Sequence, residues 1–283
     1  DNDSDGVRDS GEELAGIWVG KFETTGTASS PTILPNVSSL RDQSVSTQFA
    51  TAQKLGGTTY GVSSSSDSHM MKNSEWGSAA YLSHSKYGVN REVYINNSSS
   101  YYTGRSGGNV PGSTPINETY TDQTSTTQYN SYGYYTWDGY LLNYNTNTKS
   151  STRDFTKVAS TTGNITGIYD MAGGAIEYVM GNYNDMIEYS DFTSMPDSKY
   201  YDKYTTTSAL TACNGGVCYG HALSEVNGWY GDFAGFISAD NPWLLRGGFY
   251  GNVLIAGVFA SDIGHGASYD SIGFRAVFSP IGA

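Results

Sequence analysis

The last forty residues place the strongest constraint on what this chain can fold into. Trp243 to Phe278 reads WLLRGGFYGNVLIAGVFASDIGHGASYDSIGFRAVF, which opens on Arg-Gly-Gly and closes on Gly-Phe-Arg. Between these ends lies a run of Gly, Ser, Asp, Asn, His and aliphatic residues with no lasting hydrophobic period. Two defined ends around a middle that tolerates many residue types are typical of a scaffold that holds an exposed binding surface. They are not typical of a set of catalytic residues.

Size and charge narrow the class of protein. The chain has 283 residues, enough to bury a substantial core as one large domain or two small ones. Its 15 Lys and Arg residues against 27 Asp and Glu residues give a net charge of -12. Nucleic acid and anionic membrane surfaces both attract a basic face, so neither is an expected partner. The abundance of Ser, Thr, Asn, Gly and Tyr is instead typical of a β- and loop-rich extracellular protein.

The sequence contains no run of about 18 apolar residues, so no membrane span is predicted. No signal peptide is present either, and the chain begins abruptly inside an acidic motif. We therefore expect an upstream targeting or anchoring segment. The expected location is extracellular, either secreted or held at the cell surface.

The first twelve residues, DNDSDGVRDSGE, have the spacing of a calcium-binding loop. In such a loop alternate carboxylates converge on the ion, Gly6 allows the sharp turn, the seventh residue offers a carbonyl and the last Glu binds through both oxygens. No helix precedes the loop, so residues 1–16 are predicted to form an isolated structural calcium clip. A disordered acidic tail is the alternative. The predicted calcium ligands are Asp1, Asp3, Asp5, Val7, Asp9 and Glu12.

Cys213 and Cys218 are the two cysteines of the chain. The intervening Asn-Gly-Gly-Val loop is able to bring the sulfurs together, so a local disulfide is the main prediction. Free thiols are the alternative. A metal site needs further Cys or His ligands nearby, and a redox pair more often has the spacing Cys-x-x-Cys.

The first part of the chain predicts a strand and a helix. Ile17–Thr24 alternates apolar and polar residues, as a half-buried strand does. Ser46 is a candidate cap for a helix that runs through Leu55, with Phe49 and Ala52 facing inward.

A second helix is predicted after a Ser/Gly linker at 61–68. It begins with Asn73 and runs to about His84. The spacing of its apolar residues predicts a packing face made of Trp76, Ala79, Ala80 and Leu82.

Residues 96–165 are rich in small polar residues and Tyr, which predicts irregular segments that carry surfaces or cover a core. No break in composition marks a domain boundary, so residues 17–283 are predicted to be a single domain with insertions near 96–160 and 182–240. Short strands are expected at Glu92–Asn96, Tyr132–Trp137 and Leu141–Tyr144, and a short helix at His221–Val226.

Four segments, in order, resemble the formylglycine-generating-enzyme (sulfatase-modifying factor) type of domain, a variant of the C-type lectin fold. IWVGKFETT (Ile17–Thr25) is similar to its opening strand, and MKNSEWGSAAYL (Met71–Leu82) to its LPTEAEWEYAA helix. GNITGIYDMAGGAIEYV (Gly163–Val179) resembles N-x-x-GLYDMxGNVWEWV, and WLLRGG with IGFRAVF resembles the closing RGGSW…GFR. The resemblance covers residues 17–279 and implies an α+β fold with short antiparallel strands, two main helices and long irregular loops.

Departures from that family bear on function. Its copper-dependent members carry two cysteines just after RGG, because Cu(I) prefers thiolates, whereas Phe249–Asn252 stand there in this chain. The oxidase chemistry is therefore not expected. Members of the family often bind calcium around a Gly-Asn-Val-Trp-Glu segment. Here Gly174 replaces the Asn, while Asp170 and Glu177 remain, so a second calcium site and a buried hydrogen-bonding role for Glu177 both stay open.

The closing segment also resembles the variable proteins of diversity-generating retroelements, which share the fold and end in RGG…AGVFA…GFR. In that class template adenines are mutagenised, typically in AAY codons, so varied residues come from NNY codons. Phe249 to Ile272 contains no Lys, Glu, Gln, Met or Trp, the residues that NNY does not encode. A Gly/Ser-rich loop that avoids large charged residues is the alternative explanation. Similar surface proteins follow pilin-like helices, which is compatible with a pilin-like or lipid anchor upstream.

Catalytic groupings are weak in this sequence. A hydrolase needs a nucleophile beside a His and an orienting carboxylate, but the His residues are scattered and no Gly-x-Ser-x-Gly elbow occurs. Gly104–Gly108 lacks the Gly-Lys-Ser/Thr ending of a phosphate loop. Asp185 with Glu188, or Asp262 with Asp270, are formally glycosidase-like pairs, but an acidic chain contains many such pairs.

The sequence therefore predicts a non-enzymatic display protein that binds a protein or glycan receptor, on another cell or a phage host, through its C-terminal loops. Arg246, Gly247, Gly248 and Arg275 are predicted to be frame residues, and Val258 and Phe259 core residues. In an opposing interpretation Leu254 or Ile255 is also core. Alternative functions are a subunit of a pilus-like fibre and a divergent enzyme. The displayed side chains, which combine aromatic area with adaptable hydrogen bonding, are Phe249, Tyr250, Asn252, Leu254, Ile255, Ser261, Asp262, Ile263, His265, Ser268, Tyr269 and Asp270.

Overall fold

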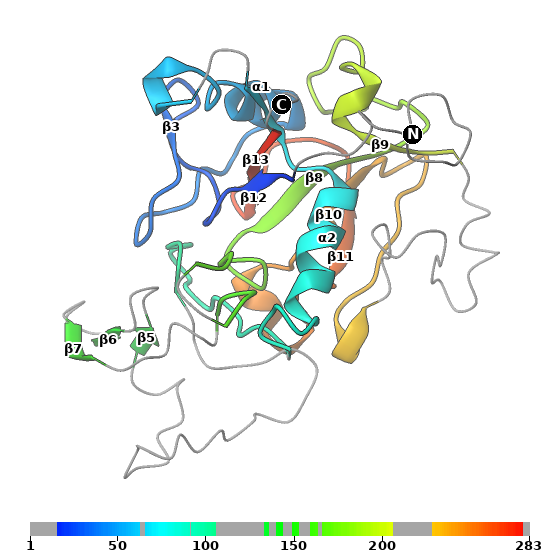
Figure 1. Ribbon diagram of the computed structural model, residues 1–283. Helices are drawn as coiled ribbons and strands as arrows, with labels where there is room; N and C mark the ends of the chain where they lie inside the picture. Colours follow the sequence, from blue (N-terminus) through cyan, green and yellow to red (C-terminus); the bar gives the residue numbers. More distant parts are fainter. Residues whose placement is uncertain are drawn as a thin grey trace.

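The computed structural model describes residues 16–62, 66–90, 92–105, 133–135, 140–143, 149–152, 159–163, 166–205 and 228–279. These residues form an α+β structure with two α-helices, α1 (Val45–Gln53) and α2 (Asn73–Ser83), and many short strands (Figure 1). The predicted calcium loop, the two cysteines and the predicted helix at 221–226 lie outside the described residues. Neither described α-helix is long and apolar enough to cross a membrane.

The central sheet is built around β8 (Ile176–Tyr183), the longest described strand. On one side of β8 lie β10 (Trp243–Arg246) and then β11 (Ser261–Gly264), both in antiparallel pairing. On the other side β12 (Ile272–Phe274) pairs with β8 in parallel, and β9 (Asp202–Tyr204) pairs with its far end. Because β10, β11 and β12 all come from the closing segment, that segment forms much of the sheet.

A second sheet joins the N-terminal part of the described chain to its C-terminal part. β13 (Ala276–Ser279) lies between β1 (Trp18–Val19) and β4 (Asp67–Met70), with antiparallel pairing on both sides. Arg275 alone separates β13 from β12, so the two sheets are covalently linked at this residue. The beginning of the closing segment is thus held in the central sheet, and its end is held in both sheets.

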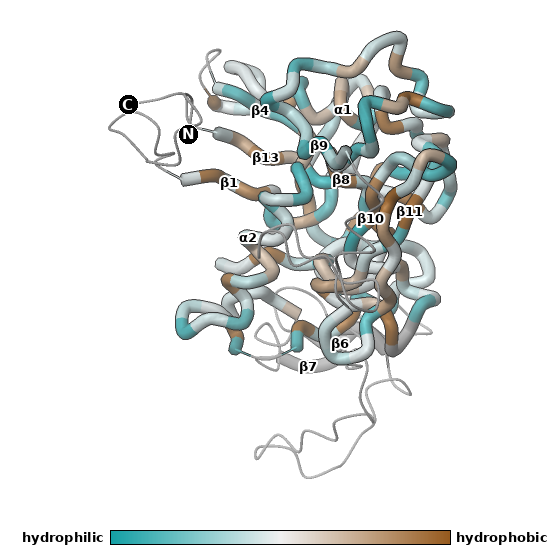
Figure 2. The backbone as a smooth tube through the Cα atoms, turned by 90° about the vertical axis from the view of Figure 1, so that its right-hand side faces the viewer, coloured by the Kyte–Doolittle hydropathy of each residue, from teal (hydrophilic) through white to brown (hydrophobic). Residues whose placement is uncertain are grey.

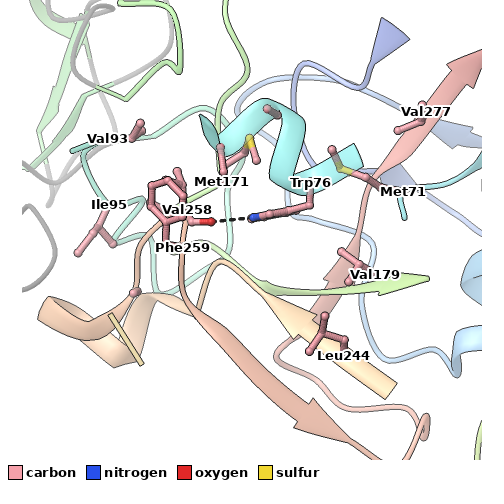
Figure 3. Close-up of a cluster of buried hydrophobic side chains, with 14 of the residues drawn as sticks. Met71, Trp76, Val93, Ile95, Met171, Val179, Leu244, Val258, Phe259 and Val277 are labelled. Carbon is pink, nitrogen blue, oxygen red and sulfur yellow. Dashed lines mark hydrogen bonds between the residues drawn. The ribbon is translucent and has the colours of Figure 1, made fainter. Parts of the chain in front are cut away.

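Side chains of β8 and β10 alternate between two hydrophobic cores, as the period of a strand requires. Val179 and Leu244 belong to the first core, which includes Trp76 of α2 (Figure 3). Tyr178 and Trp243 belong to the second core, which includes Phe49 of α1. At β8 and β10 the central sheet is therefore buried on both faces, and Figure 2 shows brown, hydrophobic residues near β10.

The helix α2 begins where the sequence predicts. The carboxylate of Glu75 accepts a hydrogen bond from the Lys72 backbone N–H at 2.8 Å, which satisfies one of the free donors at the helix start. Trp76, Ala79 and Ala80 are buried, as predicted, but Leu82 is 43% exposed, so its predicted place in the packing face is wrong. An α-helix turns about 100° per residue, which puts position 82 about 240° from Trp76. Ser83 takes the buried position instead.

The helix α1 begins with Val45 and has Ser44 at its N-cap position, so the predicted cap at Ser46 is wrong, and the helix ends at Gln53, two residues before the predicted end. Phe49 and Ala52 are buried, as predicted. The strand predicted at Ile17–Thr24 is confirmed only for Trp18–Val19. Beyond these residues the chain still bonds to the C-terminal strands, with Gly20 N–H to Ala276 O and Thr24 N–H to Phe274 O. Residues 22–25 are buried consecutively, so the alternation of a strand ends there.

Two further predictions can be compared with the structure. The strand predicted at Glu92–Asn96 is wrong, because Val93 to Ile95 are buried consecutively and only Asn96 forms a bridge, to Gly173. The strands predicted at Tyr132–Trp137 and Leu141–Tyr144 correspond to β5 (Gly133–Tyr135) and β6 (Tyr140–Asn143), which form a sheet with β7 (Lys149–Thr152). The remaining elements are β2 (Thr25–Gly26), β3 (Pro31–Thr32) and the 3-10 turns η1 (Thr58–Tyr60), η3 (Ser198–Tyr200), η5 (Trp229–Gly231) and η6 (Tyr250–Ile255).

Candidate functional site

Arg275 holds the closing end of the C-terminal segment. Its guanidinium is fully buried and donates hydrogen bonds to the Gly20 carbonyl oxygen at 2.7 Å and to Glu177 Oε1 at 2.6 Å. These contacts confirm the prediction that Arg275 anchors the frame through a backbone carbonyl and a carboxylate. Glu177 accordingly has a buried hydrogen-bonding role.

Two carboxyl groups near Arg275 complete a buried polar network. Asp170 accepts hydrogen bonds from Asn96 Nδ2 and the Gly104 N–H, both at 2.8 Å, and Glu23 accepts from Ser39 Oγ and from the Ala175 N–H. Burial raises the pKa of Asp170 to about 6 and that of Glu177 to about 7, although the Arg275 charge opposes both shifts. Burial also raises the pKa of Glu23 well above its usual value, and the charges of its two acidic neighbours add to the shift.

This network explains Gly174, where the resembled family has Asn. Gly174 has a φ of +73°, and a Cβ there would collide with Glu23 Oε1. Among the described residues no group of three or more Asp, Glu, His or Cys side chains is arranged to hold a metal ion. The second calcium site at Asp170 and Glu177 stays a hypothesis that the described geometry does not favour.

The opening end of the segment depends on two glycines. Gly247 and Gly248 have φ angles of +85° and +63°, a left-handed conformation that favours glycine. A Cβ at Gly248 would lie 2.7 Å from the Ala256 Cβ, and one at Gly247 would lie 3.1 Å from the Trp76 ring. Both positions therefore disfavour any residue with a Cβ, directly after the buried Arg246.

Between these two ends the segment contains buried, half-buried and exposed residues. Val258 and Phe259 are buried in the first core, as predicted, and the Trp76 Nε1–H donates to the Val258 carbonyl oxygen at 2.7 Å (Figure 3). Ser261 is also buried, so its side chain does not belong to an exposed surface. Leu254 lies in η6, but its side chain is outside the described part of the structure. The exposed residues are Ile255, Ser268, Tyr269 and Asp270, and the half-buried ones are Phe249, Tyr250, Asn252, Asp262, Ile263 and His265.

The segment is held to the rest of the chain by its backbone. The carbonyl oxygens of Ile255, His265 and Tyr269 accept hydrogen bonds from the N–H groups of Phe233, Tyr189 and Asp42 respectively, at 3.0 to 3.1 Å. The Tyr250 N–H donates to the Gly174 carbonyl oxygen at 3.0 Å. At four positions with exposed or half-buried side chains the chain is thus held by backbone carbonyl or N–H groups. Every residue type except proline supplies both groups.

The structure brings part of this segment together with residues that the sequence did not single out. The Tyr250 and Tyr101 rings lie 5.1 Å apart edge to face, and the Arg41 guanidinium lies over Tyr101 at 3.8 Å. The His265 and Tyr189 rings lie 5.8 Å apart. Local sequence carries no signal for these contacts, because the partners are separated by scores of residues.

A small pocket opens within the segment. It has a volume of about 130 Å³ and is lined by Asn252, Ile255, Ser261 and Asp262 together with Gly248, Ala260, Ile176 and Phe233. Phe233 is 47% exposed. Its backbone also bonds to Ser261, whose N–H donates to the Phe233 carbonyl oxygen at 2.9 Å. The sequence shows the cluster of aromatic residues in WYGDF (residues 229–233), but not that it lies beside the segment.

Asp262 supplies the charge of the pocket. Its Oδ1 accepts a hydrogen bond from the Ile263 N–H at 2.8 Å. Burial raises the pKa of its carboxyl group. In the described part of the chain no Lys or Arg forms an ion pair with it. The pocket therefore combines an aromatic and aliphatic wall with one half-buried carboxylate.

The described histidines do not form a catalytic triad. His69 is buried beside Glu75, with Nε2 and Oε1 2.9 Å apart. His84 Nδ1 lies 2.8 Å from Ser83 Oγ, but Ser83 is fully buried and also donates to the Ala80 carbonyl oxygen. Asp185 accepts hydrogen bonds from Lys203 and Tyr201, which lower its pKa, the opposite of the shift that a catalytic acid needs.

No family model and no curated protein matches this sequence. Among solved structures the chain is similar to Treponema denticola variable protein 1, with 16% sequence identity and a TM-score of 0.27. The match covers 76% of this chain and 49% of that chain, so the chain spans about half the length of that protein. A likeness this distant carries no argument about the function of this chain.

Proposed function

We propose that this chain is a non-enzymatic binding protein with a C-type-lectin-like frame, which presents residues 249–272 to a protein or glycan receptor. The observation that carries the proposal is the backbone anchoring of this segment. Ile255, His265 and Tyr269 are fixed through their carbonyl oxygens, so their side chains are available for contact and for change. A rigid backbone with adaptable side chains lowers the entropy lost on binding, as in matured antibody loops.

The sequence motifs support three further parts of this proposal, which concern location, calcium binding and diversification. We propose an extracellular or cell-surface location, a structural calcium ion at residues 1–12 and diversification of the segment by a retroelement. A reverse-transcriptase gene beside a near-repeat of the 3′ end, adenine-rich where the copies differ, supports diversification. Its absence from the neighbouring DNA removes that part of the proposal and leaves the binding function untouched.

Photo-crosslinking tests the binding function and does not require the receptor to be identified first. Benzoylphenylalanine is introduced at Tyr269 or Ile255, which are 46% and 40% exposed, and at Tyr87 as the control. Tyr87 is also well exposed, but it follows α2 outside the segment. The labelled proteins are irradiated with bacterial and animal cell-surface preparations.

The expected result is a cross-linked species that forms from the two segment positions and not from Tyr87. Unlabelled wild-type protein suppresses it, whereas the Tyr250→Ala/Ile255→Ser/Tyr269→Ala variant does not. Equal cross-linking from all three positions, or suppression by the triple variant, contradicts the proposal. Circular dichroism of each variant checks that the fold is retained.

A subunit of a pilus-like fibre is the second candidate, and one observation favours it. Trp18 is 73% exposed on β1, which lies at the edge of its sheet. An edge strand offers unpaired backbone groups to a neighbouring chain. Mass measurements over a range of concentrations test this candidate. Assembly that Trp18→Ser abolishes supports a fibre subunit, and a constant monomeric mass contradicts it.

A further inference from the structure

The pocket beside Asp262 identifies one feature of the partner. We propose that it receives a cationic side chain, Lys or Arg, from a protein receptor. The proposal rests on the binding function above and adds the chemistry of the anchoring contact.

Size is the first argument. Sites for cofactors and drug-like ligands usually measure about 300–1,000 Å³. This pocket measures about 130 Å³, close to the roughly 150 Å³ of an engineered cavity that accepts benzene. It therefore has room for the end of one side chain and not for a whole small-molecule ligand.

The lining is the second argument. Phe233, Ile255 and Ala260 are apolar, and they match the methylene stem of a Lys or Arg side chain. The aromatic face of Phe233 also attracts a cation. Asp262 is the charged group among the described lining residues, and it has no cationic partner in the described part of the chain. A half-buried carboxylate without a counterion is stabilised by an incoming positive charge.

The rigidity of the walls is the third argument. The Gly247 N–H donates to the Ala260 carbonyl oxygen at 3.2 Å, and the Ser261 N–H donates to Phe233 at 2.9 Å. Asn252 Oδ1 accepts from the Phe249 N–H at 2.8 Å, which fixes the orientation of that amide. A preformed pocket accepts a side chain without the entropy lost in ordering a loop.

The rim favours a protein as the source of the cation. Phe233 and Ile255 are 47% and 40% exposed at the mouth of the pocket. A protein that inserts one side chain also covers such a rim, which is the usual arrangement of an anchor residue at an interface. A free amine fills the pocket and leaves these apolar side chains in water. The net charge of -12 also favours a basic partner surface.

Nuclear magnetic resonance of the full chain tests the proposal with defined probes. The probe is Nα-acetyl-lysine N-methylamide, and its neutral counterpart is Nα-acetyl-norleucine N-methylamide. Asp262→Asn removes the charge but keeps an oxygen that accepts from the Ile263 N–H. Asp240→Asn is the control, because Asp240 is exposed and lies outside both the segment and the pocket lining.

We expect the lysine probe to shift the Gly248, Ile255 and Ile263 amide signals with saturation in the millimolar range. The norleucine probe and the Asp262→Asn protein should each bind about 10-fold more weakly, as the loss of one charge-assisted hydrogen bond implies. Asp240→Asn should bind the lysine probe within about twofold of wild type, because the Asp240 charge does not line the pocket. An arginine probe that shifts the same signals supports the same site.

Three results overturn the cationic pocket. They are equal binding of the lysine and norleucine probes, unchanged binding by folded Asp262→Asn protein, and tighter binding of n-butylamine than of the lysine probe, which indicates a free amine as the occupant. If the lysine probe does not bind but cross-linking at Tyr269 succeeds, the cationic pocket is overturned and the display function is not. Probe binding without cross-linking overturns the display function and with it the protein receptor.

Discussion

The buried carboxyl group of Asp232 is expected to make the protein less stable as the pH rises, and Asp232→Asn is expected to relieve this. Asp232 follows η5, is buried, and accepts a hydrogen bond from the Phe259 N–H at 3.2 Å through Oδ2. Burial, together with the nearby Glu92 carboxylate, raises the pKa of Asp232 from 3.8 to about 8, although the Phe259 N–H and Arg246 oppose the shift. The folded state therefore prefers the neutral form of this side chain.

The size of the effect follows from proton linkage. A carboxyl group whose pKa is raised by folding contributes stability that is fully present below its unfolded pKa of 3.8 and is lost as the pH rises to about 8. Within this window the free energy of unfolding falls by up to about 1.4 kcal/mol per pH unit. The total is at most about 6 kcal/mol, a large part of the stability of a typical domain.

Guanidinium unfolding of wild type and Asp232→Asn at pH 5, 6 and 7 measures this effect. Asparagine stays neutral and keeps an acceptor for the Phe259 N–H, so the variant should lose little stability at pH 5. Its advantage over wild type should then grow by about 1 kcal/mol per pH unit. Glu177, whose pKa is raised to about 7, titrates in both proteins and cancels in the difference. Glu92, whose pKa is also raised to about 7, interacts with Asp232, so this interaction is part of the measured difference.

Asp185→Asn gives the control of opposite sign. Hydrogen bonds from Lys203 and Tyr201 lower the pKa of Asp185, so its contribution is present above its unfolded pKa and is lost as the pH falls. This variant should be less stable than wild type at neutral pH and should approach wild type in acid. A constant difference between wild type and Asp232→Asn from pH 5 to 7 refutes the reasoning, since it means that Asp232 is ionised at no cost.

Three further predictions test the frame and the calcium loop. Gly248→Ala should reduce the free energy of unfolding by about 3 kcal/mol, because the left-handed backbone and the clash with Ala256 both disfavour a Cβ. An unchanged free energy of unfolding in chemical denaturation contradicts this prediction. Arg275→Met should cost about 3–5 kcal/mol by leaving buried Glu177 unpaired, with less loss below the Glu177 pKa of about 7. Calorimetry should show about one calcium ion per chain with a dissociation constant near 10⁻⁴–10⁻³ M, weakened by Glu12→Gln; no heat of binding contradicts the clip.

The sequence predicted correctly those helices and buried residues that depend on residues close together in the sequence. The start of α2 at Asn73 and the burial of Trp76 follow from helix-start chemistry and the helical period, and both are confirmed. Leu82 was predicted incorrectly because the packing face was extended by one residue too many beyond Ala80. The strand predicted at Glu92–Asn96 is wrong, because Val93 to Asn96 are buried consecutively and only Asn96 forms a bridge.

The parts of the site that sequence did not predict depend on contacts between distant residues. The burial of Asp232 and the place of Phe233 in the pocket arise because residues 233–235 pair with Ser261, and no local pattern encodes that pairing. The network of Glu23, Asp170 and Glu177 likewise joins residues more than a hundred positions apart. Asp170 and Glu177 were identified from the resemblance, whereas Glu23 was not, because its role appears only when the β8 strand lies beside it.

The way in which the segment is anchored separates what is free to change from what is not. Substitution at Ile255 or Tyr269 removes no described side-chain hydrogen bond, because their carbonyl oxygens carry the contacts to Phe233 and Asp42. Substitution at Gly248 alters the backbone path, and substitution at Arg275 removes a buried ion pair with Glu177. Variation confined to the first kind of position changes the contact surface and leaves the frame intact. Asp262 belongs to neither kind, because it is half-buried and its side chain accepts a hydrogen bond from the Ile263 N–H.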